Sequence, residues 1–378
     1  MRLRLVAPVA ALLLCSCALA PVDRAVDREP DETAEVDPLL SAAQLPHQVV
    51  VEAFVTAATP EDNIDSPAAW RAPDGKLWLY ATAKKTDHLV IYDGDSGMSV
   101  TTYGSSGAGT GQFRRPNGIA VHDDLLFVVE RDNHRVQVLA LPSLRSLAMF
   151  GDTDLVQPYG LWVRERDAGV LEVLVTDAYM AGKDAAGEDL LPPLAQLDRR
   201  VQRYELRRTG DALTTRHLGH FGDTSAAGAI RVPESIWGDP AHDRLLIAEE
   251  DLPIGTSIRE YDLEGRYRDR TIGLGQFKAQ AEGIALWACP DGSGYWLTTD
   301  QFKDRSLFNV FDRQSLRHLG AFAGTKVGNT DGVWLHQAAT TRFPQGVFYA
   351  VHDDMAVGAF DWRDIAKALG LRATCGAN

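Results

Sequence analysis

Short hydrophobic runs rich in β-branched and aromatic residues recur along the chain, each bounded by Gly, Asp, Asn or Pro. This pattern is typical of strands separated by tight turns. Long helical periodicity is nearly absent before Trp362–Leu371. The pattern therefore predicts an all-β chain with a helix close to residue 371. The clearest strand-like runs are Lys76–Thr82, Leu125–Val129, Leu171–Thr176, Arg244–Ala248, Gly294–Thr298 and Gly346–Val351.

A second strand-like run follows most of these about ten residues later, so the repeating unit is a meander of roughly 45 to 50 residues. That period is typical of propeller blades, and a sandwich or barrel would not need it. Six units predict a six-bladed β-propeller. The stretch Ala181–Arg199 interrupts the third unit, and we expect an inserted loop there that leans over one face. The second runs are Leu89–Asp93, Arg135–Leu139, Val201–Glu205, Ile258–Asp262 and Leu307–Phe311.

The first residues read as an export signal. A charged start, Met1–Arg4, precedes an apolar run through Leu14 that is too short to span a bilayer. Leu14–Cys17 resembles a bacterial lipobox, which predicts lipidation of Cys17 and a lipid-anchored protein. Ala18 after that cysteine favours the outer membrane, facing periplasm or exterior, and the alternative is an ordinary signal cleaved after Ala20. We therefore expect a signal peptide over residues 1–17.

Composition sets the remaining boundaries. Residues 18–46 are rich in Asp, Glu, Pro and Ala, which predicts a disordered tether, and residues 47–375 form the propeller. The formal net charge of −14 excludes a general nucleic-acid binder. It suits cation binding, although acidity more often marks a solvated surface.

Two cysteines, Cys289 and Cys375, remain after the predicted processing. In an oxidising compartment they could pair and fix the C-terminal segment to a late blade, and two buried thiols are the alternative. No Cys-x-x-Cys or Cys/His cluster indicates zinc.

Carboxylates gather where predicted strands end. Propeller faces place their sites at strand ends, and calcium takes six to eight hard oxygens from several segments. Any single carboxylate is more commonly a turn residue or a solvated acid. The acidic groups are Glu61–Asp65, Glu249–Asp251, Glu282, Asp331 and Asp353–Asp354.

Cations also follow predicted strands, where they could form an electropositive lip opposite the carboxylates. Arg offers a forked donor array to phosphate oxygens, and Lys acts as a point charge. Cations at strand ends are commonly just surface residues. The candidates are Lys84, Lys85, Arg131, Arg135, Lys303 and Arg305.

One unit resembles an NHL repeat. Gly104–Phe113, Arg115–Val121 and Arg131–Val136 carry the match. NHL repeats occur in propellers, so the resemblance supports the fold without fixing an activity.

Across nearly the whole globular part, from about Val49 to Leu371, the order of motifs resembles the calcium-dependent β-propeller phytases. The matching segments are Asp65–Trp70, Leu79–Lys85, Leu89–Asp93, Pro158–Gly160, Glu234–Asp239, Leu246–Asp251, Ala281–Ile284, Gly294–Tyr295, Phe311–Arg313, Asn329–Gly332, Pro344–Phe348 and Asp361–Trp362.

The resemblance implies hydrolysis of phosphomonoesters of inositol hexakisphosphate by a monomeric enzyme with several Ca²⁺ ions in a central acidic cleft. Such ions polarise phosphoryl oxygens and activate a water, while Lys and Arg hold the phosphates. It assigns metal binding to Asp65, Glu234, Glu249, Glu282 and Asp331. It assigns phosphate contacts or further acidic roles to Lys84, Lys85, Arg131, Arg135, Tyr159 and Glu250.

The chain departs from the family pattern at several positions. Ser66, Gln280 and Thr325 stand where the family carries further acids, and Lys183 and Arg203 are poor substitutes for its third-blade lysine. Fewer or weaker calcium sites would follow. A non-catalytic propeller acting as an envelope binding scaffold is therefore a second hypothesis. A calcium hydrolase of the lactonase kind is a third, disfavoured by the cationic lip.

Overall fold

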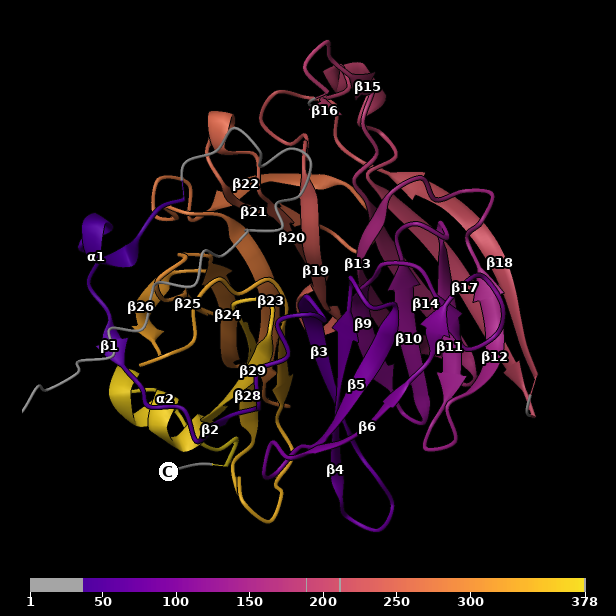
Figure 1. Ribbon diagram of the computed structural model, residues 1–378. Coiled ribbons are helices and arrows are strands. Elements are labelled where there is room, and N and C mark those ends of the chain that lie inside the picture. Colours follow the sequence, from indigo (N-terminus) through magenta and orange to yellow (C-terminus); the bar gives the residue numbers. More distant parts are fainter. Residues whose placement is uncertain (1–36, 188, 211, 377–378) are drawn as a thin grey trace, which may run out of the picture.

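The computed structural model describes residues 37–187, 189–210 and 212–376, and in these ranges it is a six-bladed β-propeller. Six sheets surround a central axis, and the first strand of each blade lies closest to that axis (Figure 1). The predicted all-β class and blade number are confirmed.

Each blade is an antiparallel meander of four strands. Blade 1 comprises β3 (Ile64–Arg71), β4 (Leu77–Ala83), β5 (His88–Asp93) and β6 (Ser99–Tyr103), and blade 2 comprises β9 (Pro116–His122), β10 (Leu125–Glu130), β11 (Arg135–Ala140) and β12 (Arg145–Phe150). Blade 3 comprises β13 (Pro158–Asp167), β14 (Val170–Asp177), β17 (Val201–Thr209) and β18 (Ala212–Phe221), and blade 4 comprises β19 (Pro233–Asp239), β20 (Arg244–Glu249), β21 (Ser257–Tyr261) and β22 (Tyr267–Ile272). Blade 5 comprises β23 (Ala281–Ala288), β24 (Gly294–Asp300), β25 (Leu307–Asp312) and β26 (His318–Ala323).

The ring closes by joining both ends of the domain in one sheet. Blade 6 contains β27 (Val333–His336), β28 (Val347–His352) and β29 (Ala356–Asp361), and its fourth strand is β2 (Phe54–Val55) from before blade 1. Residues far apart in the sequence are thus paired, for example Phe54 with Ala359. In addition, β1 (Gln48–Val49) pairs in parallel with β26 and extends blade 5 to five strands.

Side chains from facing sheets fill the space between blades. Between blades 5 and 6, Phe308, Phe322, Phe348 and Phe360 pack with ring centroids 5.0–6.2 Å apart. All four are buried. Aromatic pairs at these distances add to the free energy gained by burial, so this cluster stabilises the junction next to the ring closure.

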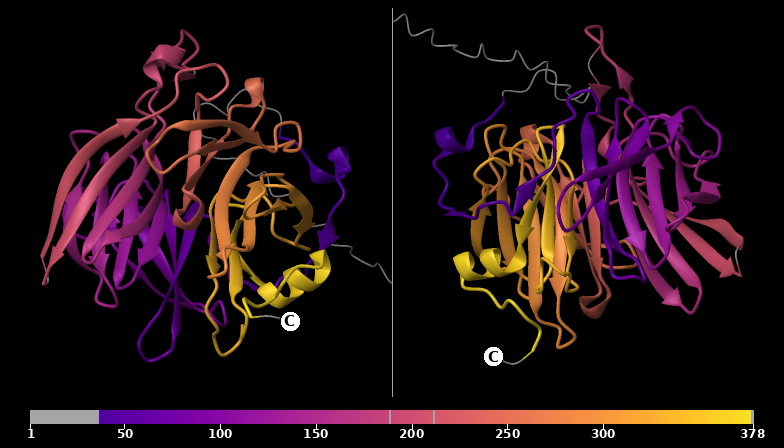
Figure 2. Two further views of the ribbon diagram at one scale, coloured as in Figure 1. Left: turned by 180° about the vertical axis from the view of Figure 1, so that it is seen from behind. Right: turned by 60° about the horizontal axis from the view of Figure 1, so that its bottom comes forward.

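Several short elements lie outside the six blade sheets. The insertion in blade 3 forms a two-stranded hairpin that projects from the molecule, at the top of Figure 1 and again in both views of Figure 2. Its placement beyond one face agrees with the predicted inserted loop. The elements are β15 (Gly182–Lys183), β16 (Asp189–Leu190), β7 (Ser105–Ser106), β8 (Gln112–Phe113), η2 (Leu194–Gln196), η3 (Pro240–His242) and η4 (Leu252–Ile254).

The first described residues belong to the segment predicted to be a tether. The short helix α1 (Leu40–Ala43) buries Leu40 against Phe302, and the Asp304 carboxylate accepts a hydrogen bond from the Leu40 N–H at 2.8 Å. Residues 40–43 of the predicted tether are thus helical, and the domain boundary at residue 46 stays a prediction. The predicted signal peptide, including Cys17, lies outside the described residues.

The C-terminal helix α2 (Trp362–Leu369) confirms the predicted helix. The Asp361 side chain caps it by accepting a hydrogen bond from the Arg363 N–H, and Gly370 ends it with a φ of 65°. Beyond it, Cys375 forms a disulfide with Cys289, so paired cysteines and not buried thiols are found. Among the described residues, no helix has the length and apolarity needed to cross a bilayer.

Candidate functional site at the channel mouth

Each blade places one polar residue at the same position, just inside the start of its first strand. In blades 1 to 5 the preceding residue pairs with the last residue of the second strand, as Pro158 does with Asp177, and a break in register follows. In blade 6 the motif Thr330–Val333 occupies the same place, since the Val351 N–H binds the Gly332 carbonyl. We name these residues the mouth ring. They are Asp65, Asn117, Tyr159, Glu234, Glu282 and Asp331.

The contacts of the ring show that its members meet around the axis. The Tyr159 hydroxyl of blade 3 donates to Asp65 Oδ1 of blade 1 at 3.1 Å, past the intervening blade 2. Lys84 Nζ lies 3.1 Å from Asp65 Oδ1 and 3.3 Å from Asp331 Oδ2. The structure therefore brings together residues that are 266 positions apart in the sequence (Asp65 and Asp331).

A second set of predicted residues occupies another repeated position, the first residue after the second strand of a blade. Lys84, Arg131 and Glu250 follow β4, β10 and β20, and Gln301 follows β24. Lys84 and Glu250 are buried beside ring residues. Arg131 is partly buried and binds Asp132, whereas Lys85 is exposed.

Lys84 and its two aspartates form the buried centre of one side of the mouth. Its side chain is 4% exposed, so the ion pairs are largely shielded from water. Ser66 donates to Asp65 Oδ2 at 2.8 Å, and Gln301 donates to Asp331 Oδ1. Burial raises the pKa of Asp331 well above its ordinary value, and Lys84 opposes this rise.

Three buried glutamates form the opposite side. Glu234, Glu250 and Glu282 each offer a carboxylate oxygen, and these oxygens lie within 4.8 Å of one another. Gln280 donates to Glu250 Oε1 at 2.7 Å. Three buried carboxylates this close repel one another unless a positive charge or protons intervene, so the cluster is suited to a cation.

Small residues after the ring allow the first strands to converge. A Cβ on Gly118 would lie 2.4 Å from the Tyr159 carbonyl, and one on Gly160 would lie 2.6 Å from the Glu234 carbonyl. Hydroxyls tie neighbouring blades here, since Thr82 donates to the Asn117 carbonyl at 2.7 Å and Thr176 to the Glu234 carbonyl at 3.0 Å. The backbone that carries the ring is thus fixed between blades.

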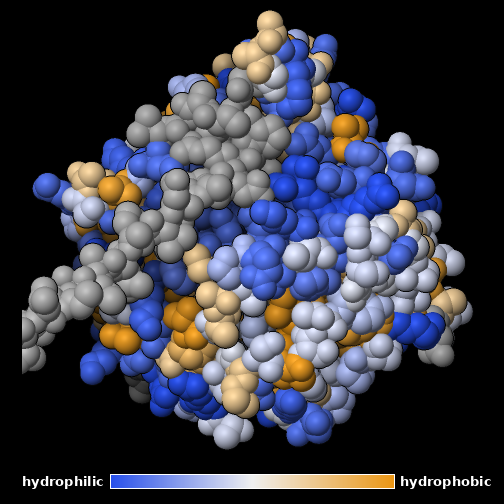
Figure 3. Space-filling view, viewed as in Figure 1, coloured by the Kyte–Doolittle hydropathy of each residue, from blue (hydrophilic) through white to orange (hydrophobic). Residues whose placement is uncertain are grey.

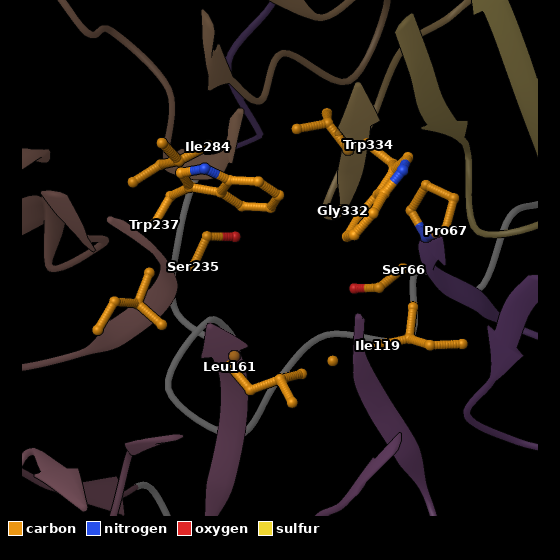
Figure 4. Close-up of a pocket in the computed structure, with 13 residues that line it drawn as sticks. Ser66, Pro67, Ile119, Leu161, Ser235, Trp237, Ile284, Gly332 and Trp334 are labelled. Atoms are coloured by element: carbon orange, nitrogen blue, oxygen red, sulfur yellow. The ribbon is translucent and has the colours of Figure 1, made fainter. Parts of the chain in front are cut away.

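An apolar cavity of about 40 Å³ lies inside the ring's first strands. Figure 4 shows Ser66 and Ser235 pointing hydroxyls into it, with Ile119, Leu161 and Ile284 around it. Trp237 and Trp334 meet edge to face, with centroids 5.5 Å apart. These side chains line the cavity, in which the two serine hydroxyls and the tryptophan N–H groups are the polar side-chain groups.

Two predicted site residues have structural partners instead. The Glu249 carboxylate is fully buried and accepts hydrogen bonds from the backbone N–H groups of Arg231, Val232 and Asp251. Burial raises the pKa of Glu249. The Arg135 guanidinium binds Glu130 at 2.7 Å and the Ala108 carbonyl at 2.6 Å. Both side chains bind backbone groups of neighbouring loops. Neither side chain is therefore placed among the contacts of the mouth.

The positions where the chain departs from the family pattern also have defined contacts. Ser66 and Gln280 each bind a carboxylate of the mouth, whereas Thr325 binds Glu52 at 2.6 Å. Lys183 pairs with Asp189 in the inserted hairpin, and Arg203 pairs with Glu172 within blade 3. Neither cation replaces a phosphate-binding lysine at the mouth.

Sequence reasoning left Asn117 and Gln301 out of the site, and did not assign a role to Asp354. Asp354 is bound by the Asn329 amide at 3.1 Å, and burial raises its pKa to about 6. Consecutive left-handed residues, Asp353 and Asp354 with φ of 54° and 56°, place it there. The repeated position after each second strand was the sequence signal for Gln301.

The face of the molecule seen in Figure 3 is mostly hydrophilic. In Figure 3, hydrophilic residues predominate and hydrophobic ones form small separate groups.

Comparisons with known proteins support the fold. Residues 113–139 match the NHL repeat family, which confirms the repeat predicted in this region. The match runs from the last residue of β8 through β9, β10 and most of β11, the first three strands of blade 2. No curated protein matches the sequence.

Several solved structures are similar at low identity. A hydrazine synthase of Kuenenia stuttgartiensis is 12% identical, with 78% of this chain and 75% of that chain covered and a TM-score of 0.45. A catalytically inactive virginiamycin B lyase of Staphylococcus aureus with quinupristin is 11% identical, with coverages of 81% and 97% and a TM-score of 0.45. A luciferin-regenerating enzyme is 8% identical, with coverages of 83% and 95% and a TM-score of 0.49. These low identities assign no activity to the chain. The chain is a six-bladed β-propeller with an NHL repeat in its second blade.

Proposed function

We propose that this chain is a calcium-dependent phosphomonoester hydrolase that resembles the β-propeller phytases and acts on inositol phosphates or related phosphomonoesters. The observation that carries the proposal is the cluster of Glu234, Glu250 and Glu282, with oxygens within 4.8 Å of one another. It lies in the same mouth as the Lys84 ammonium and the Tyr159 hydroxyl. A cation site beside donors of positive charge and hydrogen bonds suits a phosphate group.

The donor set fits calcium. All three side chains offer carboxylate oxygens, which are the hard ligands that calcium prefers, and the cluster contains neither His nor Cys. Glu234 and Glu282 lie in the first strands of blades 4 and 5, and Glu250 directly follows β20 of blade 4. Glu250 takes the place that the resemblance gave to Glu249, because the Glu249 oxygens already accept three backbone hydrogen bonds.

A bound divalent cation would polarise a phosphoryl oxygen and lower the pKa of a water. The chain's own residues would bind and orient the substrate. Lys84 is held at the centre by two aspartates, from which its ammonium can neutralise charge on a phosphoryl oxygen. The Tyr159 hydroxyl lies against the same Asp65 oxygen and can donate to a second phosphoryl oxygen. Arg131 and the exposed Lys85 would contact outer phosphates of a polyanionic substrate.

A second function, an envelope binding scaffold without catalysis, is favoured by a specific observation. Each carboxylate oxygen of Asp65 and Asp331 already has a protein partner. Asp65 Oδ1 binds Lys84 and Tyr159, and Asp65 Oδ2 binds Ser66. Asp331 Oδ1 binds Gln301, and Asp331 Oδ2 binds Lys84. Two of the predicted metal ligands are therefore engaged within the protein. For either function we propose export and lipid attachment through Cys17.

Phosphate release decides between these functions. Wild-type protein is given inositol hexakisphosphate or p-nitrophenyl phosphate, with calcium or with EDTA. We expect release only with calcium, and a loss of about a hundredfold or more for Glu282→Gln. Glu264→Gln is the matched control, since Glu264 is an exposed glutamate in the β21–β22 turn. No calcium-dependent release from either ester would overturn the hydrolase and favour the scaffold.

A further inference from the structure

Asn117 differs from the other members of the mouth ring. Its side chain is fully buried, and neither its amide nitrogen nor its amide oxygen has a hydrogen-bond partner in the described part of the chain. Burying an amide without hydrogen bonds costs free energy, so such groups are rare in native proteins. Other buried atoms of the described chain also lack a partner, but Asn117 is the residue at which both polar side-chain atoms do, and it occupies the repeated position of the mouth ring.

The backbone around Asn117 fixes where the amide lies. Thr82 of blade 1 holds its carbonyl, and the next residue, Gly118, is packed so closely against the Tyr159 carbonyl that no side chain fits. Asn117 therefore cannot shift to find partners at low cost. Blade 2 lies between blades 1 and 3, and the bond from Tyr159 to Asp65 joins those two blades. The strand that carries Asn117 thus lies between the two blades that this bond joins.

We propose that Asn117 is a ligand-binding residue of the mouth, whose amide N–H donates to a phosphoryl oxygen and whose amide oxygen accepts from a hydroxyl of the same ligand. The choice of a phosphorylated alcohol rests on the proposed function. The position of the residue and its unpaired amide do not depend on that function.

The chemistry of the ring supports this role. The ring positions of blades 4, 5, 6 and 1 are acidic, whereas those of blades 2 and 3 are the neutral Asn117 and Tyr159. Lys84 and Arg131 follow the second strands of blades 1 and 2. An anionic group would meet less repulsion on this side than beside Glu234 and Glu282. A neutral amide can donate to such a group without the charge of a carboxylate.

The test compares stability and binding in the same variants. Asn117→Leu removes the amide at similar volume, and Asn117→Asp keeps one acceptor and adds a negative charge. Asn133→Leu is the matched control, because the Asn133 amide in the same blade donates to the Gly107 carbonyl and to Glu130. Melting temperatures and inorganic phosphate affinity are measured for the full chain with a fixed low concentration of calcium.

We expect Asn117→Leu to melt at or above the wild-type temperature without phosphate, whereas Asn133→Leu melts lower. Phosphate affinity should fall at least tenfold in both Asn117 variants and stay unchanged in Asn133→Leu. A drop in melting temperature for Asn117→Leu with unchanged phosphate affinity would mean that internal water satisfies the amide, and the inference would be overturned.

The two proposals can fail separately. If wild-type protein binds phosphate through Asn117 but hydrolyses no phosphomonoester, the hydrolase fails and the binding residue stands. If hydrolysis occurs and both Asn117 variants bind phosphate like wild type, Asn117 is not a ligand-binding residue. Absence of phosphate binding by wild-type protein would overturn the Asn117 inference.

Discussion

Glu249 and Glu250 are neighbours in the chain with opposite environments. Strand β20 ends at Glu249, whose oxygens accept three backbone N–H groups from the start of blade 4 and the following loop. Asp177 and Asp300 end the second strands of blades 3 and 5 and bind backbone N–H groups in the same way. Glu249 therefore belongs to a repeated arrangement, in which an acid at the end of the second strand binds backbone N–H groups. Glu250, by contrast, is a member of the glutamate cluster at the mouth.

Replacing these two glutamates should separate stability from cation binding. Glu249→Ala leaves three buried N–H groups unpaired, and we expect a loss of about 3 kcal/mol in the free energy of unfolding. Glu250→Ala removes one member of a repulsive cluster and should cost little in EDTA. Urea unfolding with and without calcium measures both effects. Equal losses for the two variants in EDTA would contradict the division of roles.

Side chains at the mouth should also differ in how they affect kinetics, if the hydrolase proposal holds. Asp331→Ala leaves Lys84 without one of its two ion-pair partners, and Glu282→Ala removes a member of the glutamate cluster. We expect each to lower kcat by about a hundredfold or more. Lys85→Ala, at an exposed position, should mainly raise KM, because a distant phosphate contact contributes alike to ground and transition states. Steady-state kinetics with inositol hexakisphosphate would check the contrast, and a kcat loss in Lys85→Ala would contradict it.

Five of the six ring residues could be predicted from the sequence, because the order of motifs along the chain resembles that of a known family. The resemblance to a family supplied Asp65, Tyr159, Glu234, Glu282 and Asp331 from their motifs. Asn117 was missed because its segment was interpreted only as part of an NHL repeat, which fixes no site residue. Comparing Pro116–Ile119 with Pro158–Leu161 and Pro233–Ile236 would have revealed the shared position. Contacts such as Tyr159 to Asp65 depend on three-dimensional closure and cannot be seen in one sequence.

At the scale of elements, burial decided which strands were predictable. The second and third strands of the blades are mostly buried and carry continuous apolar and β-branched residues, as in Leu125–Glu130. The fourth strands are less buried, and Ser99–Tyr103 and Ala212–Phe221 are mostly exposed and lack such a signal. The two-residue strands β1 and β2 are defined only by their partners, Phe322–Ala323 and Gly358–Ala359.

The disulfide fixes one element to another. Cys289 follows β23 and Cys375 follows α2, with 86 positions between them. A cross-link over a long loop restricts the unfolded chain, and removing one typically costs about 2–5 kcal/mol. The Cys289→Ser/Cys375→Ser double variant should therefore melt at a lower temperature than wild type. Reductant should lower the wild-type melting temperature and leave the double variant unaffected, and equal melting of the two proteins without reductant would show that the link adds no stability.

At the scale of the whole molecule, the ring gathers acids that the chain keeps far apart. A net charge of −14 disfavours compaction through self-repulsion, and the structure places several carboxyl groups in buried positions near the axis. Burial raises the pKa of Asp300 to about 7 and that of Asp354 to about 6, and it raises that of Asp331 well above its ordinary value. The folded protein thus holds protons that the unfolded chain releases near pH 4.

Calcium and protons should therefore stabilise the fold in opposite pH ranges. Groups with a raised pKa contribute stability in acid that is lost as the pH rises through about 6 to 7, so the melting temperature in EDTA should fall from pH 5.5 to pH 8. If calcium binds the native state, as we propose, it should raise the melting temperature most at pH 8, where the carboxylates are ionised. Glu282→Gln should reduce the calcium effect, and Glu264→Gln should not. Thermal scans across this pH range would refute the argument if the calcium shift were absent, or if it grew toward acid, because protonated carboxyl groups cannot bind the ion.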